Sequence, residues 1–412
     1  MTDVAGQALS PPLPAPAGAP RPRRIALLNE LLEASWRRGL ADRPPLAPDA
    51  LLAKARARTG LGDFGDPAIW RTSLDRLAAA LEAQAALTPL GRTIAHGQLA
   101  GLLAGRLRAQ ALWRRHPEIA AVPIAAPIVV LGQMRSGTTR LQRLLACDRR
   151  LAYTRFFESW NPLPGRRGPP GLDDRRLRGA IGLAAARLLN PDFRIIHPTG
   201  NTAPDEEIGL QSASLFGSAF EAQWRVPGYV AHVEAMDATP VYAEFRRLLQ
   251  TLAWLRGETG GRPWILKVPQ FMQDLPALLA AFPDARLLCL DRDPAALVAS
   301  SASLVRNQMR LQSDAVDDRW IGREWLRKTR LRARRSAAAR ARAAVPQLDI
   351  GFDAMNRDWR GEMARIYRFL GLPPDPAAER RGAAFVARSA RRRLERHRYR
   401  LADFGLGPAD IA

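Results

Sequence analysis

The residues best suited to chemistry lie between 127 and 142, where the chain reads PIVVLGQMRSGTTRLQ. An apolar segment leads into a turn that contains Gly132 and Gly137, and an amphipathic helical pattern follows. In such a turn the backbone N–H groups converge on one phosphate at the N-terminus of the helix. A plain strand-to-helix turn is the alternative, but the flanking patterns favour a phosphate cradle.

The side chains of this loop indicate which phosphate compound it binds. Arg135 supplies a positive charge, and the hydroxyls of Ser136, Thr138 and Thr139 can donate hydrogen bonds. A kinase-like or other nucleoside triphosphatase loop would carry lysine directly after the second glycine, but this chain has Thr138 there. The loop therefore predicts a nucleotide donor other than a triphosphate. A kinase-like P-loop protein and a non-catalytic nucleotide- or nucleic-acid-binding protein are the alternatives.

Two other segments place cations at the ends of predicted strands. In residues 287–304 a strand ends at Asp291, Arg292 follows it, and Ser300 lies about two helical turns further on. An arginine with a hydroxyl can bind a second phosphate, although Arg-Asp-Pro is also a common strand-to-helix junction. In WILKVPQ, Lys267 ends a strand and could offset charge on a leaving phosphate; a surface lysine is the alternative.

The elements that must position these residues form an α/β fold. From residue 127 onward, apolar segments at 127–132, 264–269, 286–290 and 347–352 alternate with helical stretches, which predicts a P-loop-like parallel sheet flanked by helices. Residues 24–119 show apolar positions at three- and four-residue spacing, which predicts an all-helical N-terminal accessory region. We expect a disordered Pro/Ala-rich leader over 1–23, the helical region over 24–122 and the α/β domain over 123–412.

Composition narrows the function classes. The net charge is +22, with 62 Lys and Arg against 40 Asp and Glu. This charge favours a phosphate- or sulfate-rich partner, or else arginines spread over solvated helices such as 317–345. No nucleic-acid partner is expected, because no basic–aromatic interleaving accompanies the charge. The sequence contains no apolar run of about 18 residues, so no transmembrane segment is expected. Cys147 and Cys289 lack metal or redox spacing, which is typical of a cytoplasmic protein.

Together the three segments resemble the sulfotransferases that use 3′-phosphoadenosine 5′-phosphosulfate (PAPS). Their phosphosulfate loop has a basic residue followed by Ser/Thr-Gly-Thr-Thr, as in RSGTT at 135–139, and they pair an arginine with a serine eight residues later, as Arg292 and Ser300 do. LKVP, FPDAR, ARTGLGDFGDP and HRYRLADFGL resemble the large bacterial branch, so the resemblance covers nearly all of the chain after residue 24.

The resemblance implies a role for each matching residue. The loop, with Ser136, Gly137, Thr138 and Thr139, would hold the 5′-phosphate of PAPS. Arg292 and Ser300 would hold the 3′-phosphate, and residues 123–412 would form the PAPS-binding domain. Arg135 and Lys267 would stabilise charge on the departing bridging oxygen, which leaves 3′-phosphoadenosine 5′-phosphate (PAP) as product, with no metal needed.

One departure concerns the general base. Relatives carry a histidine four residues after the strand lysine, where this chain has Phe271. Glu158 aligns with a glutamate of many relatives, so we expect it to accept the acceptor's proton; a surface ion pair is the alternative. Glu206 belongs to an acidic cluster and His197 precedes it, so both are further candidates for contact with the acceptor.

The remaining expectations concern the C-terminus and the acceptor. Relatives fold their C-terminal segment near the nucleotide, which makes Arg396, His397 and Tyr399 candidate nucleotide contacts. We expect a small-molecule or lipid-like acceptor with a hydroxyl or amine, because apolar residues that would suit it cluster at Phe156, Phe157, Trp160, Phe216 and Trp224, although core packing explains them equally well.

Overall fold

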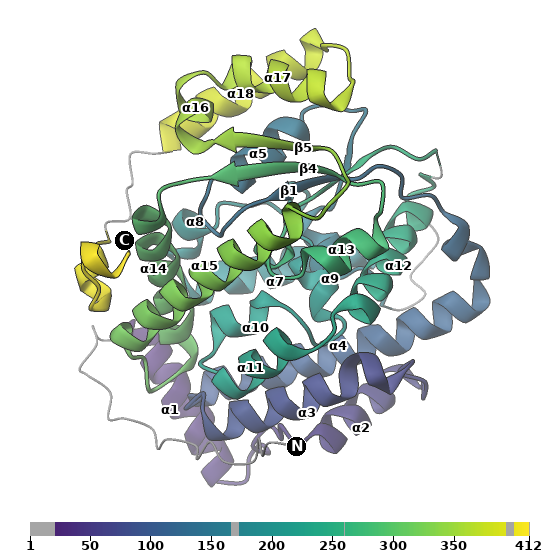
Figure 1. Cartoon of the computed structure of the whole chain (residues 1–412). Helices are drawn as coiled ribbons and strands as arrows, with labels where there is room; N and C mark the ends of the chain where they lie inside the picture. Colours follow the sequence, from purple (N-terminus) through teal and green to yellow (C-terminus); the bar gives the residue numbers. More distant parts are fainter. Residues whose placement is uncertain (1–20, 166–172, 259, 393–398, 412) are drawn as a thin grey trace, which may run out of the picture.

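The structure is a computed structural model that describes residues 21–165, 173–258, 260–392 and 399–411. The leader predicted over 1–23 lies outside the described residues up to position 20, and the first helix, α1, begins at Arg23. Figure 1 shows helices α1 to α4 at one end of the molecule and α16 to α18 at the other, with the sheet between them.

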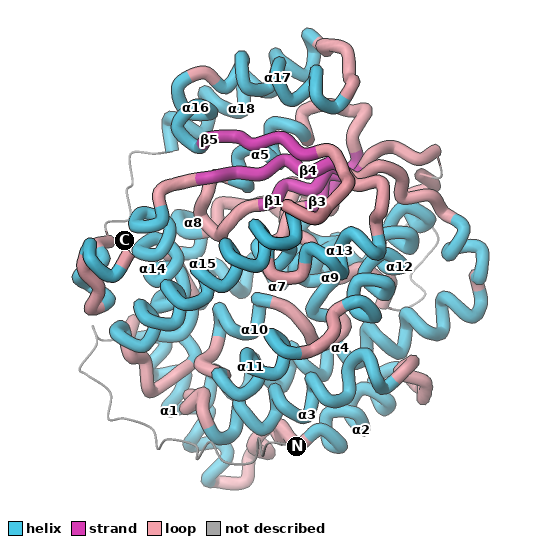
Figure 2. Tube along the Cα trace, viewed as in Figure 1, coloured by secondary structure: helices cyan, strands magenta, loops and turns pink. Residues whose placement is uncertain are grey.

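The sheet is five-stranded and parallel in the described part of the chain. Its strands are β1 (Ile128–Leu131), β2 (Ala152–Tyr153), β3 (Trp264–Leu266), β4 (Arg286–Asp291) and β5 (Gln347–Gly351), in the order β2-β3-β1-β4-β5. In the register, Val129 of β1 lies beside Leu266 on one side and Leu287 on the other. Because β1 is central, the loop that follows it opens at the middle of one sheet edge (Figure 2). The predicted α/β class is confirmed.

Alternate residues of each strand serve different cores. Ile128 and Val130 face a cluster with α5 (Thr138–Leu145) and α17 (Trp359–Leu370), whereas Val129 and Leu131 face a larger cluster on the other side. This alternation is the period-2 geometry of a strand buried on both faces. The strands are therefore continuous apolar runs, and such runs can be recognised in the sequence.

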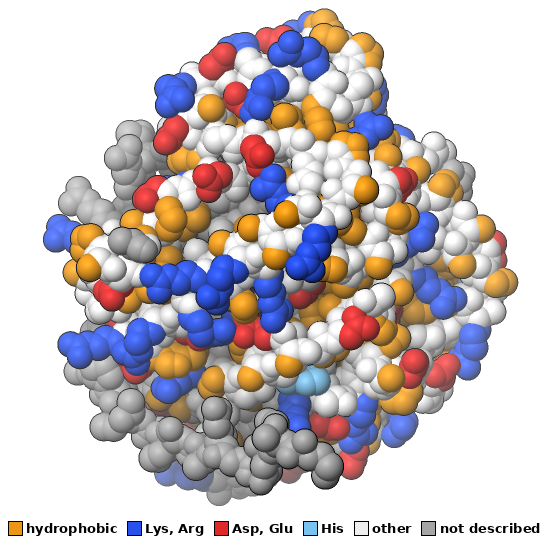
Figure 3. Space-filling model, viewed as in Figure 1, with side chains coloured by type: hydrophobic (Ala, Val, Ile, Leu, Met, Phe, Trp, Pro, Cys, Tyr) orange, Lys and Arg blue, Asp and Glu red, His pale blue; other side chains and the backbone are white. Residues whose placement is uncertain are grey.

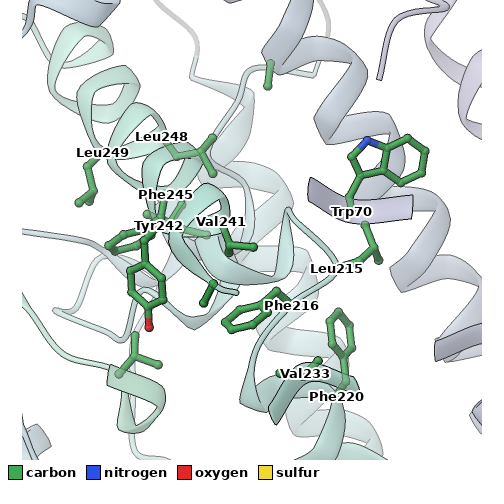
Figure 4. Packing of buried hydrophobic residues seen from close by; sticks show 14 of the residues in the cluster. Trp70, Leu215, Phe216, Phe220, Val233, Val241, Tyr242, Phe245, Leu248 and Leu249 are labelled. Carbon is green, nitrogen blue, oxygen red and sulfur yellow. The ribbon is translucent and has the colours of Figure 1, made fainter. Parts of the chain in front are cut away.

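The N-terminal helices share the larger core with the sheet. They are α1 (Arg23–Arg37), α2 (Pro48–Thr59), α3 (Pro67–Ala83) and α4 (Pro89–Arg115). Trp113 of α4 donates its indole N–H to Thr251 Oγ1 at 2.8 Å, and Arg106 pairs with Glu244 at 2.6 Å. Figure 4 shows Trp70 of α3 in the same core as Phe216 and Tyr242. The accessory region is thus all-helical and packs onto the α/β unit.

The intervening helices cover the sheet and its loops. Their bounds are α6 (Phe156–Trp160), α7 (Asp174–Leu189), α8 (Phe193–Ile196), α9 (Ile208–Ser212), α10 (Ser218–Gln223), α11 (Pro227–Ala235), α12 (Thr239–Leu255), α13 (Leu275–Ala281), α14 (Pro294–Gln312), α15 (Asp318–Arg340), α16 (Phe352–Arg357) and α18 (Pro376–Arg392), with 3₁₀ turns at η1 (Pro117–Ala121), η2 (Pro269–Met272), η3 (Leu401–Phe404) and η4 (Pro408–Asp410). None of the described helices is long and apolar enough to cross a membrane.

Helix α15 is the long basic helix predicted over 317–345. Figure 3 shows Lys and Arg side chains gathering over this element on the face in view. Its inner face is not solvated, however, because Lys328 and Arg332 are buried and both pair with Glu221 at 2.7 Å. Buried cations need such partners, so this part of the charge serves packing.

Candidate active site

The predicted cations meet at one edge of the sheet. The loop follows β1, Lys267 follows β3, Arg292 follows β4 and Phe352 follows β5. Carboxyl ends of parallel strands share an edge, which is where open α/β sheets bind ligands. A cavity of about 800 Å³ opens there, and its wall includes Arg135, Thr138, Thr139 and Arg292. The three predicted segments therefore form one site.

The loop has a backbone that its sequence permits. Gly137 has φ +93°, and a Cβ at this position would come within 2.9 Å of the Phe352 ring, so only glycine fits. Arg135 also has a positive φ of 72°, a conformation that costs about 1–3 kcal/mol in non-glycine residues and gathers at functional sites. Thr138 and Thr139 begin α5 and line the cavity, so their N–H groups lie at a helix N-terminus of positive partial charge.

Ser136 has a different part in the loop from the one expected. Its side chain is fully buried, and its Oγ donates a hydrogen bond to the Gln133 carbonyl at 2.7 Å. The hydroxyl proton is thus used within the turn. Ser136 stabilises the shape of the cradle, while Thr138 and Thr139 present polar groups to the cavity.

Arg135 connects the two predicted phosphate sites. Its Nε donates to Ser300 Oγ at 3.0 Å, and its backbone carbonyl accepts a hydrogen bond from Arg292 Nη1 at 2.5 Å. The Arg292 guanidinium stacks over Phe352 at 4.1 Å from the ring centroid. Tyr399 lies close enough to Arg135 to form a side-chain hydrogen bond with it. These contacts gather Arg135, Arg292, Ser300 and Tyr399 beside the loop.

Lys267 and Glu206 form an ion pair next to the loop. The Lys267 side chain is 1% exposed, and its Nζ donates to Thr139 Oγ1 at 3.1 Å and to Glu206 Oε1. Its backbone N–H donates to Glu207 Oε2 at 2.7 Å. Burial, the largest influence, raises the pKa of the Glu207 carboxyl to about 8. Glu206 lines the cavity, so an ionisable carboxylate and an ammonium stand together at the cradle.

His197 lies on the same wall and is oriented by a carboxylate. Its Nε2 is 3.2 Å from Asp205 Oδ2, an oxygen that also accepts from Thr199 Oγ1 at 2.6 Å. Burial alone lowers the pKa of the imidazole, but the charge and hydrogen bond of Asp205 outweigh it and raise that pKa above its usual range. His197 therefore carries positive charge to a higher pH than a free histidine, which favours an anionic neighbour.

Glu158 is not placed at the cavity by the structure. It is fully buried at the start of α6, where Oε1 accepts from Arg256 Nε at 2.9 Å and Oε2 accepts from the Arg155 N–H at 2.9 Å. Arg256 also donates to the Tyr153 carbonyl at 2.8 Å. The expected general base is instead one partner of a buried ion pair that ties α6 to the end of α12.

Phe271 is likewise a core residue. It is fully buried and packs against Tyr242 and Phe245 at ring-centroid distances of 6.1 and 6.0 Å, so it does not touch the cavity. Of the aromatics considered for the acceptor, Phe156 and Trp160 line the cavity, whereas the buried Phe157, Phe216 and Trp224 do not. Arg396 and His397 lie outside the described residues.

Sequence reasoning missed a group of wall residues. Arg140 and Arg143 on α5, Arg178 on α7 and Phe352 after β5 all line the cavity. Positions 140 and 143 are three apart on the helix that the loop begins, so the helical period was a usable signal. Arg178 had no such signal, because α7 reaches the cavity only through tertiary packing. Among the described residues, no three His, Cys, Asp or Glu side chains gather as metal ligands would.

The arrangement can bind an anion with more than one phosphate-like group and can move a proton beside it. A sulfotransferase-family model matches residues 127–376. The solved structure of sulfotransferase STF1 from Mycobacterium tuberculosis H37Rv is 29% identical with a TM-score of 0.78, covering 90% of this chain and 98% of that one. Sulfotransferase STF9 from Mycobacterium avium is 25% identical with a TM-score of 0.75, covering 88% and 93%. A search of curated proteins found no match. The matched residues include the loop, Lys267 and Arg292, and the chain belongs to the sulfotransferase family.

Proposed function

We propose that the protein transfers a sulfuryl group from PAPS to a hydroxyl or amine of an acceptor. The observation that carries this proposal is the position of Arg135, which bonds Ser300 through its side chain and Arg292 through its carbonyl. PAPS differs from a triphosphate in having anionic groups at both the 5′ and 3′ positions. The loop suits the first group, and Arg292 with Ser300 suits the second.

In this proposal the chain's residues position the reactants and stabilise charge. The acceptor oxygen bonds to sulfur as the bond from sulfur to the bridging oxygen breaks, and PAP departs with that oxygen. Lys267 stabilises the charge that develops on the bridging oxygen, supported by its position at Thr139. The acceptor's proton passes to Glu206. Such transfers depend mainly on positioning and electrostatics.

Glu206 is the better candidate for the base than His197. Glu206 lines the cavity and contacts Lys267, which places its carboxylate next to the expected reaction centre. The pKa of His197 is raised by Asp205, so near neutral pH a larger fraction of this imidazole is already protonated. We assign His197 to binding the anionic donor or acceptor, with Asp205 holding the ring.

The first test is nucleotide recognition. PAP at 100 times its Kd should raise the free energy of unfolding by about 2.7 kcal/mol. AMP and ATP at the same concentration should stabilise the protein less, because neither carries a 3′-phosphate. Thermal unfolding with each ligand measures this difference. Equal stabilisation by PAP, AMP and ATP would remove PAPS from the proposal.

The second test is transfer itself, with labelled PAPS and a panel of hydroxyl and amine acceptors. Lys267→Met should reduce transfer about 100-fold or more, by analogy with the loss of one transition-state donor, while PAP still binds. Lys54→Met, at an exposed position on α2, is the matched control and should transfer normally. PAP binding with no transfer to any acceptor would instead favour a non-catalytic nucleotide-binding protein.

A further inference from the structure

A second cavity adjoins the one beside the loop. It has a volume of about 400 Å³ and lies between α4, α7 and the end of α6. The two cavities share wall residues, namely Gln98, Trp160, Asn161, Arg178 and Gly182. The second cavity therefore borders the larger cavity, and Arg292 lines only the larger one.

The floor of the second cavity is a glycine face of α4. Gly97, Gly101 and Gly105 recur every four residues, so they lie on one side of the helix. A Cβ added at any of the three would meet nothing within 4 Å, and none of them has a positive φ. By contrast, a Cβ at Gly91 of the same helix would come within 2.0 Å of the Gln312 carbonyl oxygen.

These three glycines are thus required neither by the backbone nor by protein packing. Each glycine in a helix interior costs about 1 kcal/mol relative to alanine. What they do provide is open volume along about 12 Å of helix, taken as 1.5 Å per residue from Gly97 to Gly105. The volume is kept open beside a site that needs a second reactant.

Apolar surface predominates in the walls around this floor, although Arg58, Arg106, Arg108, Arg178 and Glu244 also line it. Leu102 and Ala109 from α4, Leu163, Ile181 from α7 and Leu248 from α12 line it. The outer face of α7 is apolar as well, because Leu177, Ile181 and Leu188 are each at least 60% exposed. Apolar wall residues beside a glycine face of about 12 Å suit a hydrocarbon chain better than a sugar or a nucleotide.

We propose that the acceptor is an amphiphile with a straight apolar chain that lies along the Gly97–Gly105 face of α4. Its reacting hydroxyl lies in the larger cavity near Glu206, and its chain passes the shared wall at Trp160 and Gly182 into the smaller cavity. This inference rests on the proposed sulfuryl transfer for the identity of the reacting group, and on the cavity alone for the chain.

The experiment uses straight-chain primary alcohols from butanol to dodecanol with the full-length protein. In the wild type, kcat/KM should rise about threefold to fourfold per methylene until the cavity is filled, since each buried methylene contributes about 0.8 kcal/mol. Gly101→Leu should fill the second cavity, here called the groove, and abolish this rise. Transfer to butanol and PAP binding should stay within about twofold of the wild-type values. Replacing a helical glycine by leucine favours the helix, so this variant should fold.

Gly62→Leu is the matched control, because Gly62 is exposed, has the same open space around its Cβ and lines neither cavity. It should keep the wild-type dependence on chain length. A flat chain-length series in the wild type, or equal behaviour of Gly101→Leu and Gly62→Leu, would overturn the inference.

A binding measurement separates this inference from the proposed function. Calorimetry with decanol and the PAP-bound protein needs no turnover and should show binding that Gly101→Leu weakens at least tenfold and Gly62→Leu does not. If decanol binds in this way but no alcohol is sulfated, the groove stands and the proposed transfer to hydroxyls fails. If butanol is sulfated but decanol neither binds nor reacts better, the transfer stands and the groove fails.

Discussion

Replacing Arg292 by alanine should remove the preference for a 3′-phosphate. The Arg292 guanidinium is held by two contacts, a hydrogen bond of 2.5 Å to the Arg135 carbonyl and stacking at 4.1 Å on Phe352. Its remaining N–H groups are available to the cavity, whose wall it forms. Because the side chain is already ordered, little conformational entropy is lost when it binds an anion.

The size of the expected loss in PAP affinity follows from the removal of one charged hydrogen-bonding group. Hydrogen bonds to charged groups contribute about 1.5–3 kcal/mol, which corresponds to about 10- to 150-fold in Kd. Arg292→Ala should therefore weaken PAP binding by about this factor and change the Kd for AMP less than about threefold. Arg292→Lys should lie between, since an ammonium keeps the charge but not the planar pair of donors.

Isothermal calorimetry measures the Kd of both PAP and AMP. The ionic strength is held constant because salt screens exposed charges. Thermal unfolding without ligand checks that the variants are folded. The reasoning is refuted if Arg292→Ala leaves the ratio of the PAP and AMP affinities unchanged. An equal loss of affinity for PAP and AMP would mean that Arg292 supports the loop through Arg135 and does not bind the 3′-phosphate.

Three further substitutions test the acidic residues. Glu206→Gln should lower kcat about 100-fold with PAP affinity nearly unchanged, measured with labelled PAPS; a normal kcat would exclude Glu206 as base. Glu158→Gln should leave kcat within about threefold but cost roughly 3 kcal/mol in urea unfolding, because the Arg256 charge stays buried without its partner; a large loss of kcat in folded protein would restore Glu158 to the site. For Glu207, whose folded pKa is raised from 4.5 to about 8, stability is present below pH 4.5 and lost as pH rises toward 8, by at most about 1.4 kcal/mol per unit. Glu207→Gln should remove that decline between pH 5 and 8, and identical pH profiles for both proteins would contradict the raised pKa.

The sequence predicts an element of the fold correctly where the burial of that element leaves a recognisable pattern of apolar residues. Strands β1 and β4 are buried on both faces, so their apolar runs are continuous and readable. Strand β3 spans 3 residues and lies within the apolar segment predicted at 264–269. Strand β2 spans 2 residues, too short for a periodic signal. Helix α7 lines the cavity through tertiary packing, which no local pattern indicates.

The sequence by itself determined the form of the loop after β1. A tight turn, a helix N-terminus and a glycine at positive φ are local features, fixed by residues within a few positions of Gly137. Because the carboxyl ends of parallel strands share one edge, the sequence also predicts that Lys267 and Arg292 lie on the same side as this loop.

Only the tertiary structure decided which carboxylate reaches the site. Glu158 and Glu206 both lie in short segments between β2 and α9 and carry the same chemistry. Arg256, 98 residues from Glu158, takes that carboxylate into the core, while Lys267, 61 residues from Glu206, holds the other at the cavity. A buried charge is stable only beside a partner of opposite charge. The position of that partner depends on packing between segments that are distant in the sequence, so no local pattern predicts it.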